Sequence, residues 1–391
     1  MLKNLPPRVR EEEYINIDPI QRGGVLTLEA RKALIVYGDG YSLCDYCFSP
    51  FRLDYIKKPN IADFIQELAE FIGMETVRIV RGARDGFRTV MNALLNKGDI
   101  VLVSSLSHYS LCLAIEASKG RWKEIPTNEK NIITPDAVAE KIEETKEKEG
   151  TLPKLVAIHH VDYQFGNLHP VREIAKVCHE YDIPFLLNGA YTVGIMPING
   201  KEIGADFIVG SGHKSMAAPS PVGILATNEE FSKLILRSPK IEGDITGRKF
   251  GIKEVELLGC TVMGAPLIGL LASFPEVKER VKKWDEEIDK INYFTKNFLK
   301  IEGNKILSEM PRKHTLTRVD TRKSFDKIAN NHKRKGYFLT DELKKRGIVG
   351  IFPGSTKIWK LNTYGLTWKQ IKYLSDVFIE IAEKYGIFVE N

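Results

Sequence analysis

Hydrophobic and polar residues alternate along the first two thirds of the chain with two different periods. Short apolar runs such as Ile100-Val-Leu-Val-Ser104 and Phe207-Ile-Val209 are typical of buried strands. Between them, apolar residues recur every three or four positions, as on one face of a helix. The pattern predicts strands over 100–104, 155–161, 184–188, 206–210 and 222–227, and helices over 61–72, 83–96, 109–118, 135–148 and 171–181. This alternation indicates an α/β fold, with a mainly parallel sheet and helices on both faces.

The character of the chain changes past about Arg237. A glycine-rich connection over 242–251 leads to predicted helices near 261–273 and 275–298, and an α+β portion ends in a helix over 367–385. We therefore predict three parts. They are an N-terminal arm over 1–30, a large domain over 31–255 and a small C-terminal domain over 256–391.

Composition narrows the class of protein. The 391 residues are 43% hydrophobic and 28% charged, as in a soluble globular protein. The longest apolar runs are too short to span a bilayer, and the N-terminus lacks the apolar core of a signal peptide. We expect a cytoplasmic protein with no membrane partner. The five cysteines form no secreted disulfide pattern, so they should be reduced thiols, ligands or redox groups.

The net charge of +6 is concentrated in one segment. Residues 312–337 carry nine Lys or Arg and two Asp. Such a concentration suits a polyanion such as RNA. A solvated loop and helix face would give the same pattern.

Candidate chemistry gathers where the predicted strands end. Lys214 follows small residues at the end of one strand, and open α/β sheets bind ligands at that edge. A desolvated lysine can act as a nucleophilic amine, although most lysines are surface charges. Arg84 lies at a glycine-containing helix start that could bind a phosphate, and His108 could stack on a planar ring or be structural. Asn188 and Tyr191 follow another strand.

The order of these groups, with the tripeptide Gly212-His213-Lys214, resembles the fold-type I pyridoxal-phosphate enzymes, particularly the class V aminotransferase and cysteine desulfurase branch. The resemblance implies that Lys214 forms the Schiff base with pyridoxal 5'-phosphate and that His108 stacks on its ring. Asn188 would face the ring nitrogen, and Tyr191 or Tyr163 would lie near the phenolic oxygen. The implied phosphate-binding residues are Ala83, Arg84, Ser211, Gly212 and His213.

Two departures from that branch point to an unusual substrate. Asn188 replaces the usual Asp, and a neutral amide makes the ring a weaker electron sink. A weak sink suffices if Cβ carries a good leaving group such as phosphate. Lys360 stands about where related enzymes have an Arg that clamps a free carboxylate. An amino acid esterified to tRNA has no free carboxylate to clamp.

Three cysteines have local motif context, namely Cys44 and Cys47 in Cys-x-x-Cys and Cys260 in Leu-Gly-Cys-Thr. They fit an iron–sulfur cluster with an open iron or a persulfide-carrying trio. Cys260 could instead be a buried core residue, and core is the better interpretation of Cys112 and Cys178.

Together with Pro19-Ile-Gln-Arg-Gly-Gly24, these motifs resemble the archaeal O-phosphoseryl-tRNA:cysteinyl-tRNA synthases. That resemblance implies conversion of phosphoserine on tRNA(Cys) into cysteine, with Lys214, His108 and the three cysteines in catalytic roles. It also implies a homodimer and a complex with the phosphoseryl-tRNA synthetase. Candidates for binding the leaving phosphate are Arg81, Arg84, His108, Arg248 and Lys249. The alternatives are a cysteine desulfurase acting on free cysteine and an RNA-binding protein whose cofactor site has decayed.

Overall fold

The computed structural model describes residues 14–20, 22–37, 42–43, 61–249, 254–259 and 262–390. The chain forms two compact units. The larger comprises Gly23–Tyr163 and His169–Lys282, and the smaller comprises Met1–Arg22, Gln164–Leu168 and Lys283–Asn391. The three-part division at residues 30 and 255 stays a prediction.

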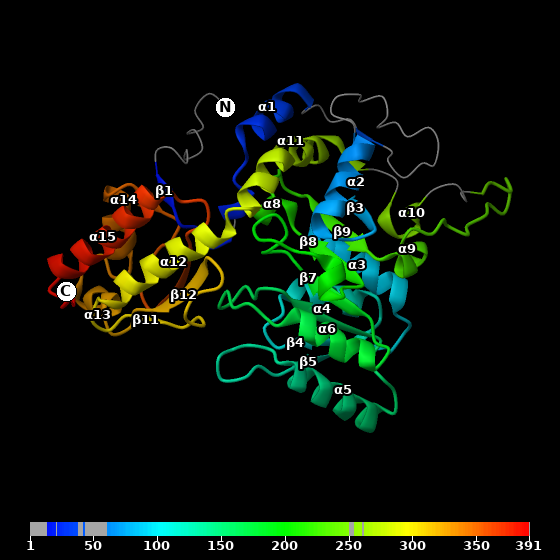
Figure 1. The fold of residues 1–391 in the computed structure, drawn as a ribbon, viewed down its shortest axis with the longest axis horizontal. Helices are drawn as coiled ribbons and strands as arrows, with labels where there is room; N and C mark the ends of the chain where they lie inside the picture. Colours follow the sequence, from blue (N-terminus) through cyan, green and yellow to red (C-terminus); the bar gives the residue numbers. More distant parts are fainter. Residues whose placement is uncertain are drawn as a thin grey trace. The chain divides into compact units, whose positions relative to one another are not determined.

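A seven-stranded sheet forms the centre of the larger unit (Figure 1). Its strands, in spatial order, are β3 (Thr76–Val80), β9 (Gly223–Thr227), β8 (Phe207–Gly210), β7 (Phe185–Asn188), β6 (Leu155–His159), β4 (Ile100–Ser104) and β5 (Arg121–Ile125). Neighbours from β8 to β5 run parallel, whereas β9 is antiparallel to both β8 and β3. In this sheet β9 therefore opposes the other six strands. The predicted mainly parallel sheet is confirmed, and it has seven strands.

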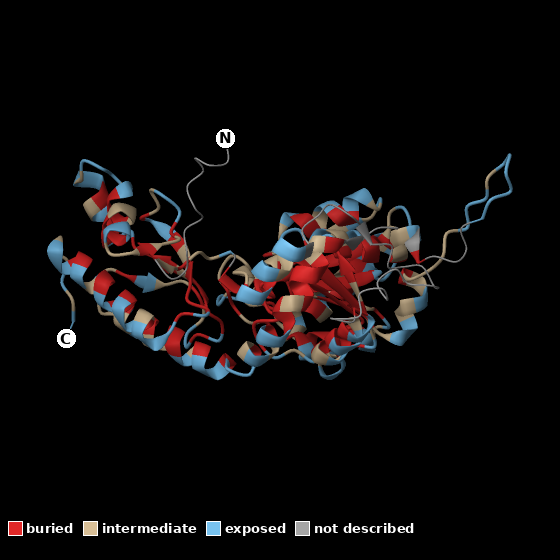
Figure 2. Ribbon diagram, turned by 90° about the horizontal axis from the view of Figure 1, so that it is seen from above, coloured by how far each residue is buried: buried red, intermediate tan, exposed pale blue. Residues whose placement is uncertain are grey.

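Helices surround this sheet, and most of them bury apolar residues in its core. They are α1 (Leu28–Tyr37), α2 (Ile61–Ile72), α3 (Ala83–Leu94), α4 (Tyr109–Ala117), α5 (Pro135–Glu149), α6 (Val171–Glu180), α7 (Gly200–Ile203), α8 (Gly212–Ser215), α9 (Glu229–Ile235), α10 (Val255–Leu258) and α11 (Gly264–Val281). The strands β6 and β4 are buried along their whole length. Figure 2 shows the centre of the larger unit in the red of buried residues, as expected for a sheet covered on both faces. A short ladder pairs β2 (Ser42–Leu43) with β10 (Val262–Met263).

The smaller unit has its own core and an antiparallel sheet of three strands. The strands are β11 (Lys305–Ile306), β12 (Leu316–Asp320) and β14 (Ile358–Asn362), and β1 (Ile15–Asn16) pairs separately with β13 (Ile348–Val349). The helices are α12 (Trp284–Leu299), α13 (Phe325–Asn331), α14 (Tyr337–Lys345) and α15 (Trp368–Lys384). Trp359 stacks on Phe378 at 5.8 Å in the core between sheet and helices. Aromatic packing of this kind stabilises a small unit strongly.

Two expectations about the elements were wrong. The predicted break between helices at 274–275 is absent, because α11 continues through Pro275 as far as Val281. Buried Phe274 and Val277 lie on either side of the proline, and their burial offsets the backbone hydrogen bond that it removes. The two edge strands, β3 and β5, were not among the predicted elements. The sequence of β5, RWKEI, is largely polar, and only its last residue is buried. Among the described residues, every helix is too short or too polar to cross a membrane.

Candidate active site

A cavity of about 330 Å³ opens at the carboxyl edge of the large sheet. His159 and Asn188 are the last residues of β6 and β7, and Ser211 and Arg81 follow β8 and β3 directly. Most of the predicted site residues line this one cavity: Ala83, Arg84, His108, Asn188, Tyr191, Ser211, His213 and Lys214, with Tyr163 and Arg81 beside them. Gly212 is buried as the first residue of α8. The topology therefore gathers residues from five separate segments at one place.

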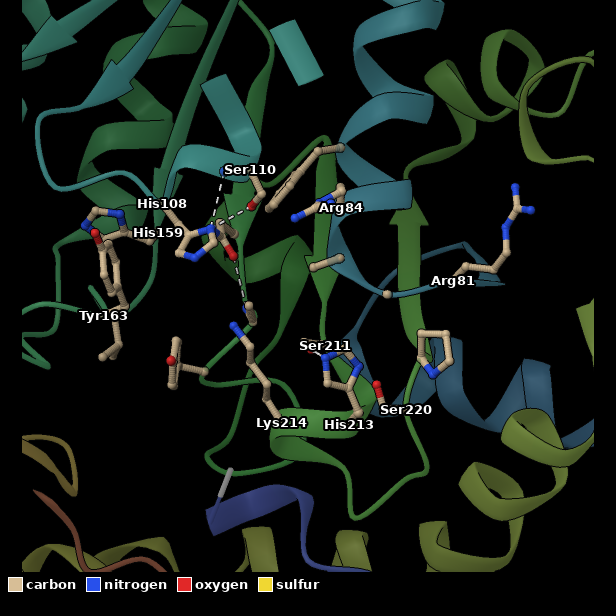
Figure 3. A pocket seen from close by; sticks show the side chains of 18 residues that line it. Arg81, Arg84, His108, Ser110, His159, Tyr163, Ser211, His213, Lys214 and Ser220 are labelled. Carbon is tan, nitrogen blue, oxygen red and sulfur yellow. Dashed lines mark hydrogen bonds between the residues drawn. The ribbon is translucent and has the colours of Figure 1, made fainter. Parts of the chain in front are cut away.

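Lys214 projects from α8 into the cavity toward His108 (Figure 3). Its side chain is half-buried, and Nζ lies 4.9 Å from the centre of the Tyr191 ring. The backbone beneath it is tightly packed, since a Cβ on Gly24 would lie only 2.0 Å from the carbonyl oxygen of His213. A lysine held this way can present its amine to a carbonyl in the cavity.

The start of α3 forms a cradle for an anion. The N–H groups of Ala83 and Arg84 donate to no acceptor among the described residues, and the helix dipole makes this end positive. Gly82 adopts a φ of 87°, which favours glycine, and turns the chain sharply from β3 into α3. Gly223 packs against this turn, where a Cβ would lie 2.7 Å from the Gly82 carbonyl carbon. Free N–H groups at a helix start suit a phosphate.

His213 closes the cradle on the other side. Its Nδ1 donates to the carbonyl oxygen of Val222 at 3.0 Å. Burial lowers the pKa of His213, with the neighbouring Lys214 charge contributing in the same direction. Nε2 of the neutral ring can accept a hydrogen bond from the Ser211 hydroxyl, 3.4 Å away. The hydroxyl and the ring are therefore held together at the edge of the phosphate cradle.

His108 serves two structural purposes at once. As the N-cap of α4, its Nδ1 accepts from the backbone N–H of Ser110 at 3.3 Å and lies 2.8 Å from the Ser110 hydroxyl. A backbone N–H can only donate, so the ring proton lies on Nε2. The ring packs edge to face with Tyr163 at 5.2 Å and against Tyr109 at 4.2 Å. The cap fixes the ring against one wall of the cavity.

Asn188 presents a donor to the cavity. Its Oδ1 accepts from the N–H of Ala190 at 3.1 Å, which orients the amide and leaves Nδ2 with no acceptor among the described residues. A pyridine nitrogen that carries no proton is such an acceptor. The free amide, the cradle and Lys214 together fit pyridoxal 5'-phosphate, which has a ring nitrogen, a phosphate and an aldehyde.

Comparison with known proteins agrees with this geometry. The O-phospho-L-seryl-tRNA:Cys-tRNA synthase 1 of Methanococcoides burtonii is 62% identical over 380 residues, which make up 97% of this chain and 83% of that protein. The corresponding synthase of Methanoculleus marisnigri is 57% identical and is matched over 96% of both chains. The chain belongs to the O-phospho-L-seryl-tRNA:Cys-tRNA synthase family.

One family model and several solved structures also match this chain. Residues 123–388 match the family of O-phosphoseryl-tRNA(Sec) selenium transferase, SepSecS. The crystal structure of a SepCysS–SepCysE N-terminal domain complex superposes with a TM-score of 0.88 at 44% identity, over 98% of both chains. The apo cysteine desulfurase of Thermococcus onnurineus has a TM-score of 0.72 at 16% identity over 97% of this chain and 99% of that one. This last match shows the fold alone, which is the fold-type I architecture predicted from the sequence.

Some residues expected in the synthase site lie elsewhere. Lys249 pairs with Glu242 at 3.2 Å on an exposed hairpin, and neither Lys249 nor Arg248 lines the cavity. The three cysteines at positions 44, 47 and 260 fall outside the described residues. Cys178 is buried, and burial raises the pKa of its thiol to about 12, as expected for a core residue.

A buried histidine pair, His159 and His169, lies at the wall of the synthase site and was not predicted from the sequence. Nδ1 of His169 accepts from the N–H of Ile133 at 3.0 Å, so the ring proton lies on Nε2, 3.0 Å from Nε2 of His159. Burial, together with the nearby His169, lowers the pKa of His159 to about 3. His159 therefore stays neutral, accepts from His169 and carries its own proton on Nδ1. The two histidines lie ten residues apart with no regular spacing, and only the return of the chain after β6 brings them together.

Proposed function

We propose that the protein converts O-phosphoseryl-tRNA(Cys) to cysteinyl-tRNA(Cys), by β-elimination of phosphate followed by addition of sulfur. The observation that carries the proposal is Lys214, which faces a cavity containing free helix N–H groups and the oriented Asn188 amide. The curated relatives that carry the synthase name support the choice of substrate.

Pyridoxal phosphate, when bound, supplies an electron sink for charge that develops at Cα of the substrate. The N–H groups of Ala83 and Arg84 would hold its phosphate, and Nδ2 of Asn188 would donate to its ring nitrogen. His108 would cover one face of the ring. The neutral amide leaves that nitrogen without a proton, so the sink is weaker than with a carboxylate partner.

Lys214 supplies the base. Nζ, which lies in the cavity 4.9 Å from the centre of the Tyr191 ring, accepts the proton from Cα. The phosphate then leaves Cβ with the electron pair of the C–O bond. Arg84, whose guanidinium lies 3.3 Å from the Tyr109 hydroxyl at the cavity wall, can neutralise the charge of the departing phosphate. A sulfur nucleophile adds to Cβ, and Cα recovers a proton from the Lys214 ammonium. If the nucleophile is a persulfide, the adduct is a disulfide between product and enzyme; a second cysteine thiol of the proposed trio attacks it, forms an enzyme disulfide and releases the cysteinyl product.

The cysteines at positions 44, 47 and 260 are the proposed carriers of sulfur, as a persulfide or on an iron–sulfur cluster. The ladder between β2 and β10 supports this assignment. Leu43, which precedes Cys44 in the sequence, pairs with Val262, two residues after Cys260.

We also propose that the protein acts in the cytoplasm as a homodimer and associates with the phosphoseryl-tRNA synthetase. The matching crystal structure is of a SepCysS–SepCysE N-terminal domain complex, which supports assembly with a further protein.

The decisive experiment compares Lys214→Ala with Lys201→Ala in the cofactor-loaded protein. Lys201 is exposed and pairs with Glu75, so its loss should leave cofactor absorbance and turnover of O-phosphoseryl-tRNA(Cys) intact. Lys214→Ala should lose the absorbance of the lysine-bound cofactor and at least about 100-fold in turnover, the usual scale for a general base. Full turnover by that variant would overturn the proposal. Consumption of free cysteine without tRNA would favour the desulfurase instead.

A further inference from the structure

A second cavity, of about 480 Å³, lies in the smaller unit. It borders α13, and its far wall is the turn that follows α15. The lining residues are Glu302, Lys323, Ser324, Lys327, Ile328, Asn331, His332, Tyr385, Gly386 and Ile387. We call this cavity the α13 groove. Its volume is within the range of roughly 300–1,000 Å³ that is usual for ligand sites.

The charge of the basic segment 312–337 is not spread evenly. Five of its nine cationic side chains are engaged within the protein. Arg312 is buried and donates to the carbonyls of Gly166 and Leu316 at 2.6 Å. Lys313 pairs with Glu309, Arg318 lies over the Phe165 ring, Arg322 pairs with Asp320, and Arg334 pairs with Asp341.

The other four cations are Lys323, Lys327, Lys333 and Lys335. All four are exposed, and none forms an ion pair with any residue in the described ranges. Lys323 and Lys327 line the α13 groove, where Glu302 is the single carboxylate among the lining residues. The unpaired charge of the segment is therefore concentrated at and beside this groove.

The remaining walls of the groove suit a sugar–phosphate chain. Nδ1 of His332 accepts from the N–H of Arg334 at 3.0 Å, which leaves the Nε2 side as a donor. The His332 ring packs edge to face with Tyr385 at 5.8 Å, which puts two aromatic rings in the groove lining with the lysines. Aromatic surface beside lysines is the usual combination in sites that bind single strands or exposed nucleotides.

Four unpaired lysines exceed the charge of one phosphate monoester, which favours a polyanion over a small ligand. Lysines bind phosphates as point charges and read no base sequence. We propose that the α13 groove binds the phosphodiester backbone of the tRNA substrate. This inference rests on the proposed function, because it assumes that tRNA is the polyanion presented to the protein.

The test measures the affinity of the cofactor-loaded protein for tRNA(Cys) transcript over a series of salt concentrations. Lys323→Gln with Lys327→Gln removes two charges at the groove. The matched control, Lys369→Gln with Lys372→Gln, removes two exposed charges at the start of α15 that form no ion pair within the part of the chain that the structure describes. Lys372 precedes Tyr385 by thirteen residues, about 20 Å along the helix.

The double variant Lys323→Gln with Lys327→Gln, the groove pair, should bind tRNA about tenfold more weakly at ~0.1 M salt. Because two phosphate contacts are lost, its plot of log K against log[salt] should also be less steep than that of the parent, by about 2. The control pair should keep the affinity and slope of the parent. In turnover, the groove pair should raise KM for O-phosphoseryl-tRNA(Cys) and leave kcat and the cofactor absorbance unchanged. Lys327→Arg, which keeps the charge, should bind as the parent does.

Equal losses in both pairs would overturn the inference, since net charge and not the groove would then matter. Unchanged binding in the groove pair would also overturn it. In either case a parent protein that still converts the charged tRNA leaves the proposed function standing. A parent protein that neither binds tRNA(Cys) nor turns over its phosphoseryl form would contradict the proposed function itself.

Discussion

The guanidinium of Arg280 donates to the carbonyl oxygen of Ser215 at 2.6 Å, directly after the lysine that we assign as the base. The same nitrogen lies 2.8 Å from the carbonyl oxygen of Gly23, and Nε donates to that of Gly194. Arg280 belongs to the last turn of α11 and does not line the cavity. One side chain thus joins the last residue of α8 to the segments at Gly23 and Gly194, and acts as a positioning residue for Lys214.

Replacing Arg280 with Ala should weaken both the fold and the site. Three carbonyls lose a charged donor, and each such hydrogen bond contributes about 1.5–3 kcal/mol. We expect the apo protein to lose at least about 2 kcal/mol of its free energy of unfolding in urea, and pyridoxal phosphate to bind more weakly. Arg280→Lys should lose less, because an ammonium can serve one carbonyl but not all three. Parent-like stability and cofactor affinity in the Ala variant would contradict this role.

The buried histidines predict a loss of stability in mild acid. Burial lowers the pKa of His160 to about 4, and that of His159 to about 3, from a usual value of 6.5. Between about pH 6.5 and pH 4, both histidines are therefore protonated in the unfolded chain and neutral in the folded protein. Stability is present in full above pH 6.5 and falls below it, by about 2 kcal/mol from each histidine between pH 7 and pH 5.

His160→Phe isolates one of these two contributions. Nδ1 of His160 is buried without a hydrogen-bond partner, so an aromatic ring of similar shape loses no bond there. Urea unfolding of the variant between pH 7 and pH 5 should show a decline about 2 kcal/mol smaller than that of the parent. Parallel declines in the two proteins would show that His160 is already protonated in the fold or titrates normally.

Local patterns predicted the central sheet well because its strands carry short, continuous apolar runs. The strand over 100–104 and the helix over 61–72 have the predicted bounds, and most others differ by one or two residues at an end. The same patterns could not reveal Arg280, whose importance lies in carbonyls contributed by distant segments. Arg312 shows the converse. Its sequence context suggested a solvent-facing cation, and only tertiary packing makes it a buried donor to the loop over 164–168.

His108 could be given either a structural or a cofactor-binding role from the sequence, and the geometry supports both. Two substitutions can separate them. Asn is among the strongest N-cap residues, so His108→Asn keeps the acceptor for Ser110 and removes the ring. His108→Phe keeps an aromatic ring against Tyr163 and removes the cap.

We expect opposite effects from the two variants. His108→Phe should lose about 1 kcal/mol of the free energy of unfolding, the usual contribution of an N-cap, and should retain most of its affinity for pyridoxal phosphate. His108→Asn should unfold within a few tenths of a kcal/mol of the parent and bind the cofactor several-fold more weakly, because an aromatic contact contributes about 0.5–1.5 kcal/mol. Urea unfolding of the apo protein and titration with pyridoxal phosphate measure the two quantities separately. If His108→Asn binds pyridoxal phosphate as tightly as the parent does, the ring makes no contribution to cofactor binding. The N-cap of α4 would then be the role of His108.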